Sequence, residues 1–181
     1  MRLSLLVLAL AVAAPVAAQG VIIQQAPAAP TWADAYAELR QGASAPALTA
    51  LDAYLLSGAS GSFARTDVDG LRNTVDLTQD GFGQIALADL RGDLNRLTVD
   101  QVGDRNLYGV TLLGSDNRQA TVQRGDDNAY VMQFAGSGLR HTVLQEGDGN
   151  VAIQVGAGVP SSIVQRSAGP GPGMTLLIEH R

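Results

Sequence analysis

The sequence predicts an all-β fold, a β-solenoid of about five strand-turn-strand rungs preceded by a short helical segment. Glycine returns every eleven residues over residues 70–169, and an amide residue follows most of these glycines by three positions. The residues between the glycines alternate in polarity with period two, which is typical of strands. Because Gln stands two positions before only every second glycine, the true repeat is twenty-two residues made of two similar halves.

Residues 1–18 are predicted to be a secretory signal peptide. Arg2 supplies a positive charge, residues 3–14 are apolar, and small residues precede a cleavage site between Ala18 and Gln19. The apolar run is shorter than the stretch of about 20 residues that spans a bilayer, so a membrane anchor is the weaker alternative. We therefore expect the mature chain to be secreted and extracellular.

The composition narrows the classes of function. The net charge of -5 argues against a nucleic-acid partner, and the absence of cysteine excludes disulfide scaffolds and thiolate metal sites. The two histidines, His141 and His180, have no Ser or Cys arrangement that would make a nucleophile. The Gly-Asp turns resemble those of calcium-binding solenoids, but the nonapeptide spacing of that class is absent. We therefore predict no enzyme, no catalytic residue, no cofactor, no metal and no small-molecule substrate.

Residues 19–61 are predicted to be a leader segment. Residues 19–30 are rich in Gln, Ala and Pro without periodicity, which indicates a flexible chain. Apolar residues at helical spacing predict two short helices, over residues 32–39 and 48–55. These helices are either an export or docking element or a segment that packs on the repeat or stays mobile.

Residues 62–181 are predicted to form the solenoid. Seven-residue strands joined by four-residue turns leave no room for a crossover helix, so each unit is a strand, a turn and a strand. Stacking pairs every strand with its equivalent at about 4.8 Å, and glycine permits positive φ and close approach of successive turns. The predicted turn glycines are Gly81, Gly92, Gly103, Gly114, Gly125, Gly136, Gly147 and Gly158.

Identical positions of stacked units form columns. Asn over Asn and Gln over Gln can exchange side-chain amide hydrogen bonds along the stack, while Val, Leu, Ala and Tyr fill the space between them. We predict that this amide ladder serves assembly. Its members are Asn73, Gln79, Gln84, Asn95, Gln101, Asn106, Asn117, Gln123, Asn128, Gln145, Asn150 and Gln165.

Two outward columns also follow from the register. Thr74 is followed by Arg96, Arg118 and Arg140, which form either a site for an anionic partner or a solvated face. The returning strands present an apolar stripe that is larger than a soluble monomer normally exposes, so we expect residues 32–56 or a second coil to cover it. The stripe consists of Ile85, Leu87, Leu107, Val131, Val151 and Ile153.

The segment Gln145-Glu146-Gly147-Asp148-Gly149-Asn150-Val151-Ala152 carries the clearest copy of the repeat motif. Over residues 62–181 the motif resembles the repeat of the curlins, the bacterial amyloid subunits of curli fibres. The resemblance implies a structural protein that nucleates or forms extracellular amyloid fibres in a biofilm matrix. Its implied partners are other curlin subunits and the outer-membrane curli secretion machinery. The alternative is a monomeric surface-binding solenoid, such as an adhesin or a carbohydrate-binding protein.

The last unit bears on the role within that family. Ile163-Val164-Gln165-Arg166 and residues 174–181 are similar to the Arg-containing last repeat of the minor, nucleating curlin, which favours the minor subunit over the major one. The chain departs from the family where Leu90, Leu112 and Phe134 replace the second Gln of the repeat.

The ends of the repeat show no polar capping segment of the kind that keeps repeat proteins apart. We therefore expect the ends, or at least the rung of residues 73–94, to pair with another curlin subunit through backbone hydrogen bonds.

Overall fold

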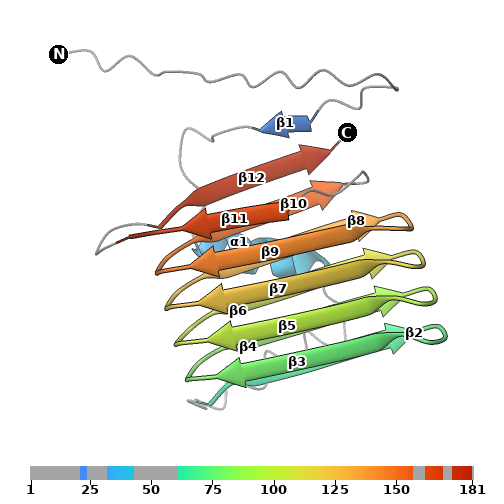
Figure 1. Cartoon of the computed structure of the whole chain (residues 1–181), viewed down its shortest axis with the longest axis horizontal. Helices are drawn as coiled ribbons and strands as arrows, with labels where there is room; N and C mark the ends of the chain where they lie inside the picture. The colour runs from blue at the N-terminus through green and yellow to red at the C-terminus, as the bar shows by residue number, and fades with distance from the viewer. Residues whose placement is uncertain (1–20, 24–31, 43–60, 157–161, 169–172, 181) are drawn as a thin grey trace.

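The structure, a computed structural model, describes residues 21–23, 32–42, 61–156, 162–168 and 173–180. Two sheets lie against each other and the chain passes from one to the other at every turn (Figure 1). The five-stranded sheet has the order β11 (Ser162–Arg166), β9 (Arg140–Glu146), β7 (Arg118–Arg124), β5 (Arg96–Val102) and β3 (Thr74–Asp80). The seven-stranded sheet has the order β1 (Val21–Ile23), β12 (Thr175–His180), β10 (Val151–Gly156), β8 (Ala129–Ala135), β6 (Leu107–Leu113), β4 (Ile85–Arg91) and β2 (Phe63–Asp69).

The rungs stack in parallel and in register. From β3 to β9 and from β2 to β8, each strand pairs with the strand twenty-two residues further on, so that Gln101 lies opposite Gln123 and Tyr108 opposite Tyr130. Between β9 and β11 the sequence spacing of paired residues is shorter than twenty-two, as the pairing of Ser162 with Thr142 shows. The predicted all-β solenoid of about five rungs is confirmed, with β2 as an additional half rung at one end.

The interior is built by alternate residues of both sheets. In β5, β7 and β9 every second side chain is buried, as period-two alternation requires. The core contains Tyr108, Tyr130 and Met132 as its bulky members, and Leu90, Leu112 and Phe134 are buried among them. Apolar side chains therefore occupy the positions at which the curlin-like motif has its second Gln.

The outer face of the seven-stranded sheet is covered over β6, β8 and β10 by α1 (Trp32–Gly42), which lies behind the sheets in Figure 1. Ala35 and Leu39 of this helix are buried in one cluster with the apolar stripe. Gly109 interrupts the stripe, and a Cβ there would overlap the Leu39 side chain. The prediction that residues 32–56 cover the stripe is confirmed for α1. The second expected helix, residues 48–55, lies outside the described residues.

The strand β1 alters two of the expectations from the sequence. Val21–Ile23 lies within the segment predicted to be a flexible leader, yet it pairs antiparallel with β12, Ile22 lying opposite Glu179. This end of the seven-stranded sheet therefore carries a short added strand, where the sequence indicated no cap. The expectation of an uncapped end is wrong here, because three apolar residues suffice for such pairing and leave no periodic signal.

None of the described helices is long and apolar enough to cross a bilayer.

Candidate functional site

A continuous glutamine column runs through the interior beside the turns that follow the odd-numbered strands. Gln101 Nε2 donates to Gln123 Oε1 at 2.8 Å, and Gln123 Nε2 donates to Gln145 Oε1 at 2.8 Å. The column begins with Gln79, whose Nε2 donates to Gln101, and it ends at Gln165, which accepts from Gln145. Several of these Nε2 groups also donate to a carbonyl of the opposite sheet, as Gln123 does to Leu107 at 3.0 Å. The column therefore ties both successive rungs and the two sheets together.

The asparagine columns bond in a different way from the expected exchange between side chains. Asn95 Nδ2 donates to the Gly114 carbonyl at 2.9 Å, while its Oδ1 accepts the backbone N–H of Asn117 at 3.1 Å. Asn73, Asn95 and Asn117 follow this pattern in the five-stranded sheet, and Asn106 follows it in the other. One side-chain pair, Asn150 Nδ2 to Asn128 Oδ1 at 2.9 Å, matches the expectation. These four amides thus each form two hydrogen bonds with the backbone of the next rung, which satisfies groups that the strand ladder leaves open.

Gln84 takes the place of asparagine in the same column as Asn106, Asn128 and Asn150. Its Nε2 donates to the carbonyls of Asp80 and Gly103. All the predicted amide residues therefore lie in the interior columns, and their role in assembly stays a prediction. Ala18, Gln19 and Gly158 lie outside the described residues.

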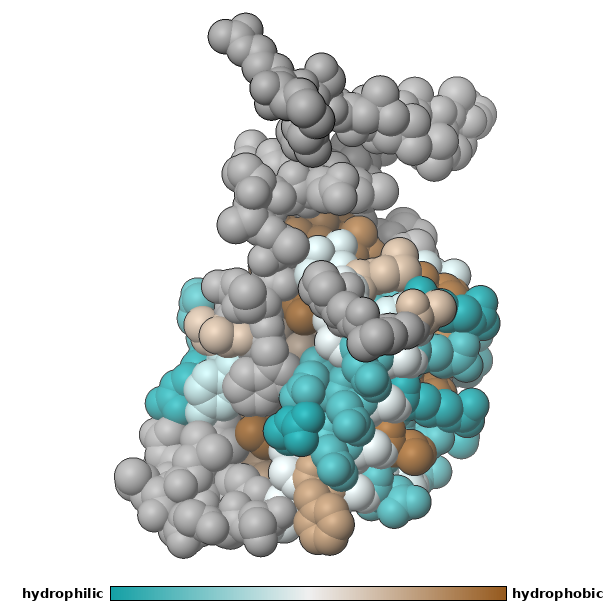
Figure 2. Space-filling model, turned by 90° about the vertical axis from the view of Figure 1, so that its left-hand side faces the viewer, coloured by the Kyte–Doolittle hydropathy of each residue, from teal (hydrophilic) through white to brown (hydrophobic). Residues whose placement is uncertain are grey.

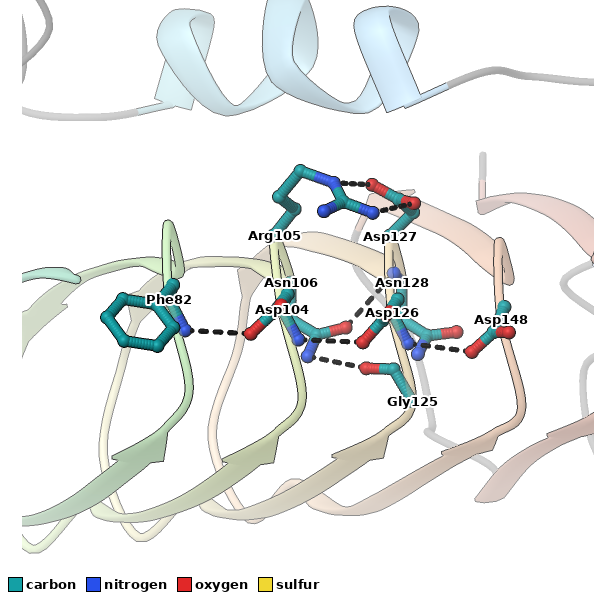
Figure 3. Close-up of polar contacts among 9 residues, drawn as sticks. All are labelled: Phe82, Asp104, Arg105, Asn106, Gly125, Asp126, Asp127, Asn128 and Asp148. Atoms are coloured by element: carbon teal, nitrogen blue, oxygen red, sulfur yellow. Dashed lines mark hydrogen bonds and ion pairs between the residues drawn. The ribbon is translucent and has the colours of Figure 1, made fainter. Parts of the chain in front are cut away.

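The turns stack as closely as the strands (Figure 3). Gly125 N donates to the Val102 carbonyl at 3.0 Å, and Asp127 N donates to the Asp104 carbonyl at 3.0 Å, so the hydrogen-bond ladder continues around the bend. Gly125 has φ of +114°, and a Cβ there would lie 2.5 Å from the Gly147 carbonyl oxygen. Gly103 meets the Gly125 carbonyl in the same way. Glycine is required at these positions by both conformation and space.

An aspartate column runs along this stack of turns (Figure 3). Asp126 Oδ1 accepts the backbone N–H of Asp104 at 2.8 Å, and Asp148 Oδ1 accepts that of Asp126 at 2.8 Å. Beside them Arg105 forms two bonds of 2.7 Å to Asp127, and the hydrogen bond and charge of Asp127 raise the pKa of the Arg105 guanidinium. Figure 2, which views the molecule from the left-hand side of Figure 1, shows hydrophilic residues gathered over these turns.

A buried polar group that the sequence analysis did not predict lies at the centre of the coil. Tyr108 OH donates to Gln119 Oε1 at 2.6 Å, and Gln119 Nε2 donates to Thr121 at 2.6 Å. His141 is buried with its ring stacked against Tyr130, the ring centroids being 6.1 Å apart. Burial raises the pKa of both tyrosines well above their usual range. The signal for this group was the placement of Gln119 and His141 at inward positions, two residues after Asn117 and Leu139.

The arrangement offers stacking surfaces at the two ends of the coil. Within the described residues no three His, Asp or Glu side chains are grouped so that they could hold a metal ion. The strands β2 and β3 end their sheets on one side, and β1 and β11 end them on the other. Since successive rungs are joined by parallel backbone pairing that a further rung could continue, the ends of the coil are the candidate functional surfaces.

Comparison with known proteins assigns part of the coil to a family of repeats. Residues 70–103, which contain β3, β4 and β5, match the family model of the curlin associated repeat. This part of the chain therefore carries a curlin-type repeat. No curated protein and no solved structure matches the chain significantly.

Proposed function

We propose that this chain, with a curlin associated repeat at residues 70–103, is a structural subunit of an extracellular curli-type amyloid fibre. In this function the rungs of one subunit continue those of the next, so that the fibre is held together by the same backbone and glutamine ladders as the coil. The partners are other curlin subunits and, during export, the outer-membrane curli secretion machinery.

The observation that carries the proposal is the composition of the β2 and β3 end. Turns inside the coil present Asp or Ser to the preceding turn, as Asp93 does to the backbone N–H of Leu71 and Asp104 to that of Phe82. The first two turns carry Leu71 and Phe82 at the equivalent positions, and these side chains are 72% and 69% exposed. Exposed apolar side chains in the turns at both ends of β3 are suited to be buried against another subunit that pairs with the terminal strands.

At the β2 and β3 end, the glutamine column presents a hydrogen-bond acceptor. Gln79 Nε2 donates towards Gln101, so the Gln79 Oε1 faces the position that a preceding rung would occupy. Among the described residues no donor reaches this oxygen. The side-chain Nε2 of a glutamine in a second subunit would donate to this Gln79 Oε1 and continue the column.

The chain's role as the minor, nucleating subunit is part of the proposal. It is supported by the Arg-containing last unit, in which Arg166 bonds to Glu146 at 2.6 Å on the outer face. Charge on a terminal strand disfavours further strand addition, so the β11 end is the better candidate for attachment to the cell surface. Deletion of residues 161–181 is expected to release the protein from cells while its ability to seed fibres remains. Loss of seeding with retained attachment would reverse this assignment of the two ends.

The test is fibre formation by the mature chain, residues 19–181. We expect thioflavin fluorescence to rise and electron microscopy to show fibres, and we expect Phe82→Asp to slow growth by about tenfold because it places a charge in the subunit contact. Val102→Asp, which changes an exposed residue of β5 within the coil, is the matched control and should grow at the parent rate. A chain that stays monomeric would contradict the proposal, and a monomer that binds surfaces would support the adhesin alternative.

A further inference from the structure

A column of three arginines runs along the outer face of the five-stranded sheet. Arg96, Arg118 and Arg140 are the first residues of β5, β7 and β9, and the strand register places them directly beside one another. In-register parallel strands set such side chains about 4.8 Å apart. This face is opposite to the one that α1 covers (Figure 1).

The column concentrates positive charge with little compensation. Asp116 is the carboxylate that pairs with it, at 3.9 Å from Arg118. Asp100, on β5 of the same face, lies 4.0 Å from Arg124 at the other end of the strands. In the part of the chain that the structure describes, Arg96 and Arg140 form no ion pair. Because like charges on neighbouring strands repel one another, the column is destabilising unless an anion lies along it.

An open trough runs beside the arginines. Thr98, Ala120 and Thr142, the next outward residues of the same strands, form its floor and leave a volume of about 320 Å³. These side chains are short, and Arg96, Arg118 and Arg140 line the same volume. The threonine hydroxyls can donate to and accept from a neutral hydroxylated ligand.

From this arrangement we propose that the column and its trough bind a linear acidic polysaccharide, a polymer whose carboxylates recur along the chain. Guanidinium groups bind carboxylates through two parallel hydrogen bonds, and a regular row of arginines suits a regular row of carboxylates. The hydroxyls of Thr98 and Thr142 contact the sugar rings between the charges. The site is separate from the ends of the coil, so it goes beyond the proposed assembly function.

Two observations favour a polysaccharide over a nucleic acid. The residues that line the trough include no exposed aromatic side chain on which bases could stack. The chain as a whole carries a net charge of -5, which repels polyanions. This repulsion weakens binding of a nucleic acid, with a phosphate on every nucleotide, more than binding of a polysaccharide whose charges are separated by neutral groups. A nucleic acid is therefore an outcome that the experiment has to distinguish.

The test measures binding of sodium polygalacturonate to the freshly purified mature chain by isothermal titration calorimetry at low ionic strength. The triple variant Arg96→Gln, Arg118→Gln, Arg140→Gln is expected to bind at least about tenfold more weakly, because each substitution removes a charged hydrogen-bond donor. The matched control is Arg72→Gln, Arg124→Gln, Arg166→Gln, which removes the same charge from exposed positions outside the column. The control is expected to stay within about twofold of the parent.

Single substitutions and other polymers sharpen the test. Arg118→Gln should weaken binding more than Arg96→Gln or Arg140→Gln, because it interrupts the column in the middle. Neutral dextran should not bind. Equal losses in the two triple variants, or no loss in either, would overturn the proposal. Tighter binding of a DNA fragment that also depends on the column would assign the site to nucleic acid instead.

Discussion

Gln101 Nε2 donates a 2.8 Å hydrogen bond to Oε1 of Gln123, and both side chains are fully buried. Gln123 Nε2 in turn donates to Oε1 of Gln145, so a glutamine inside the column donates to one neighbour and accepts from the other. The bonds all point in the same direction, so the column has a donor end and an acceptor end, whereas the backbone bonds between successive rungs run in both directions.

Gln123→Leu should therefore leave two buried amides without partners, the Nε2 of Gln101 and the Oε1 of Gln145. We expect the free energy of unfolding in urea to fall by about 3 kcal/mol. The control is Gln79→Leu at the start of the column, where the side chain is half-buried and makes one bond to another glutamine. Equal losses in the two variants would show that the column does not act through its hydrogen bonds.

Gly125→Val should cost about 1–3 kcal/mol of unfolding free energy and slow assembly, because it strains the backbone at φ of +114° and presses against Gly147 and Asp148. Gly138→Val separates the two causes, since Gly138 has φ of +76° but nothing lies within 4 Å of a Cβ there. Gly61→Val, at an open position, should be neutral. If Gly138→Val and Gly125→Val cost the same in chemical denaturation, the contact between turns contributes nothing.

Gly109→Val should displace α1 from the sheet. Its neighbours in the column, Leu87 and Val131, carry full side chains, and Leu39 occupies the space that Gly109 leaves. Hydrogen exchange of the α1 amides should become faster and binding of a hydrophobic dye should increase, because the apolar stripe is uncovered. Leu39→Ala in the same chain should restore slow exchange. If slow exchange persists in the single variant, Gly109 is not needed for docking of the helix.

Alkaline pH should unfold the protein through Tyr108 and Tyr130. Burial raises the pKa of each tyrosine, so above pH 10 the unfolded chain loses these protons first. Stability is then fully present below pH 10 and falls above it by about 1.4 kcal/mol per pH unit for each tyrosine. Urea unfolding from pH 8 to pH 12 should show a shallower decline in Tyr130→Phe than in the parent. Parallel declines would mean that Tyr130 ionises equally in both states.

Much of the fold could be predicted from the sequence because the register is redundant. Glycines eleven residues apart, the amides after them and the period-two alternation each assign the same strands and turns. The outward direction of Arg96 and Ile85 followed from that alternation alone. The burial of Leu90 and Leu112 followed in the same way.

Other features lie beyond such patterns. Asparagine and glutamine carry the same amide, but Asn95 bonds to the backbone of the next turn, while Gln101 bonds to the next Gln. The residue type alone does not decide the pattern, since Gln84 also donates to a backbone carbonyl of the next turn. Arg105 adopts φ of +55° in a turn where Gly83 and Gly149 occupy the equivalent positions, and its bonds to Asp127 accompany this conformation. The pairing of β1 with β12 joins segments far apart in sequence through three residues, which no periodicity could indicate.

The twenty-two-residue register also constrains how the gene can change. The bond from Asn95 N to Asn73 Oδ1 recurs from Asn117 N to Asn95 Oδ1, so an inserted copy of one unit meets compatible partners on both sides. In-frame duplication or loss of a whole unit would lengthen or shorten the coil without new contacts being required. Insertion of a single codon within a strand would turn every later side chain of that strand to the opposite face. Divergence in length among related genes should therefore occur in whole units.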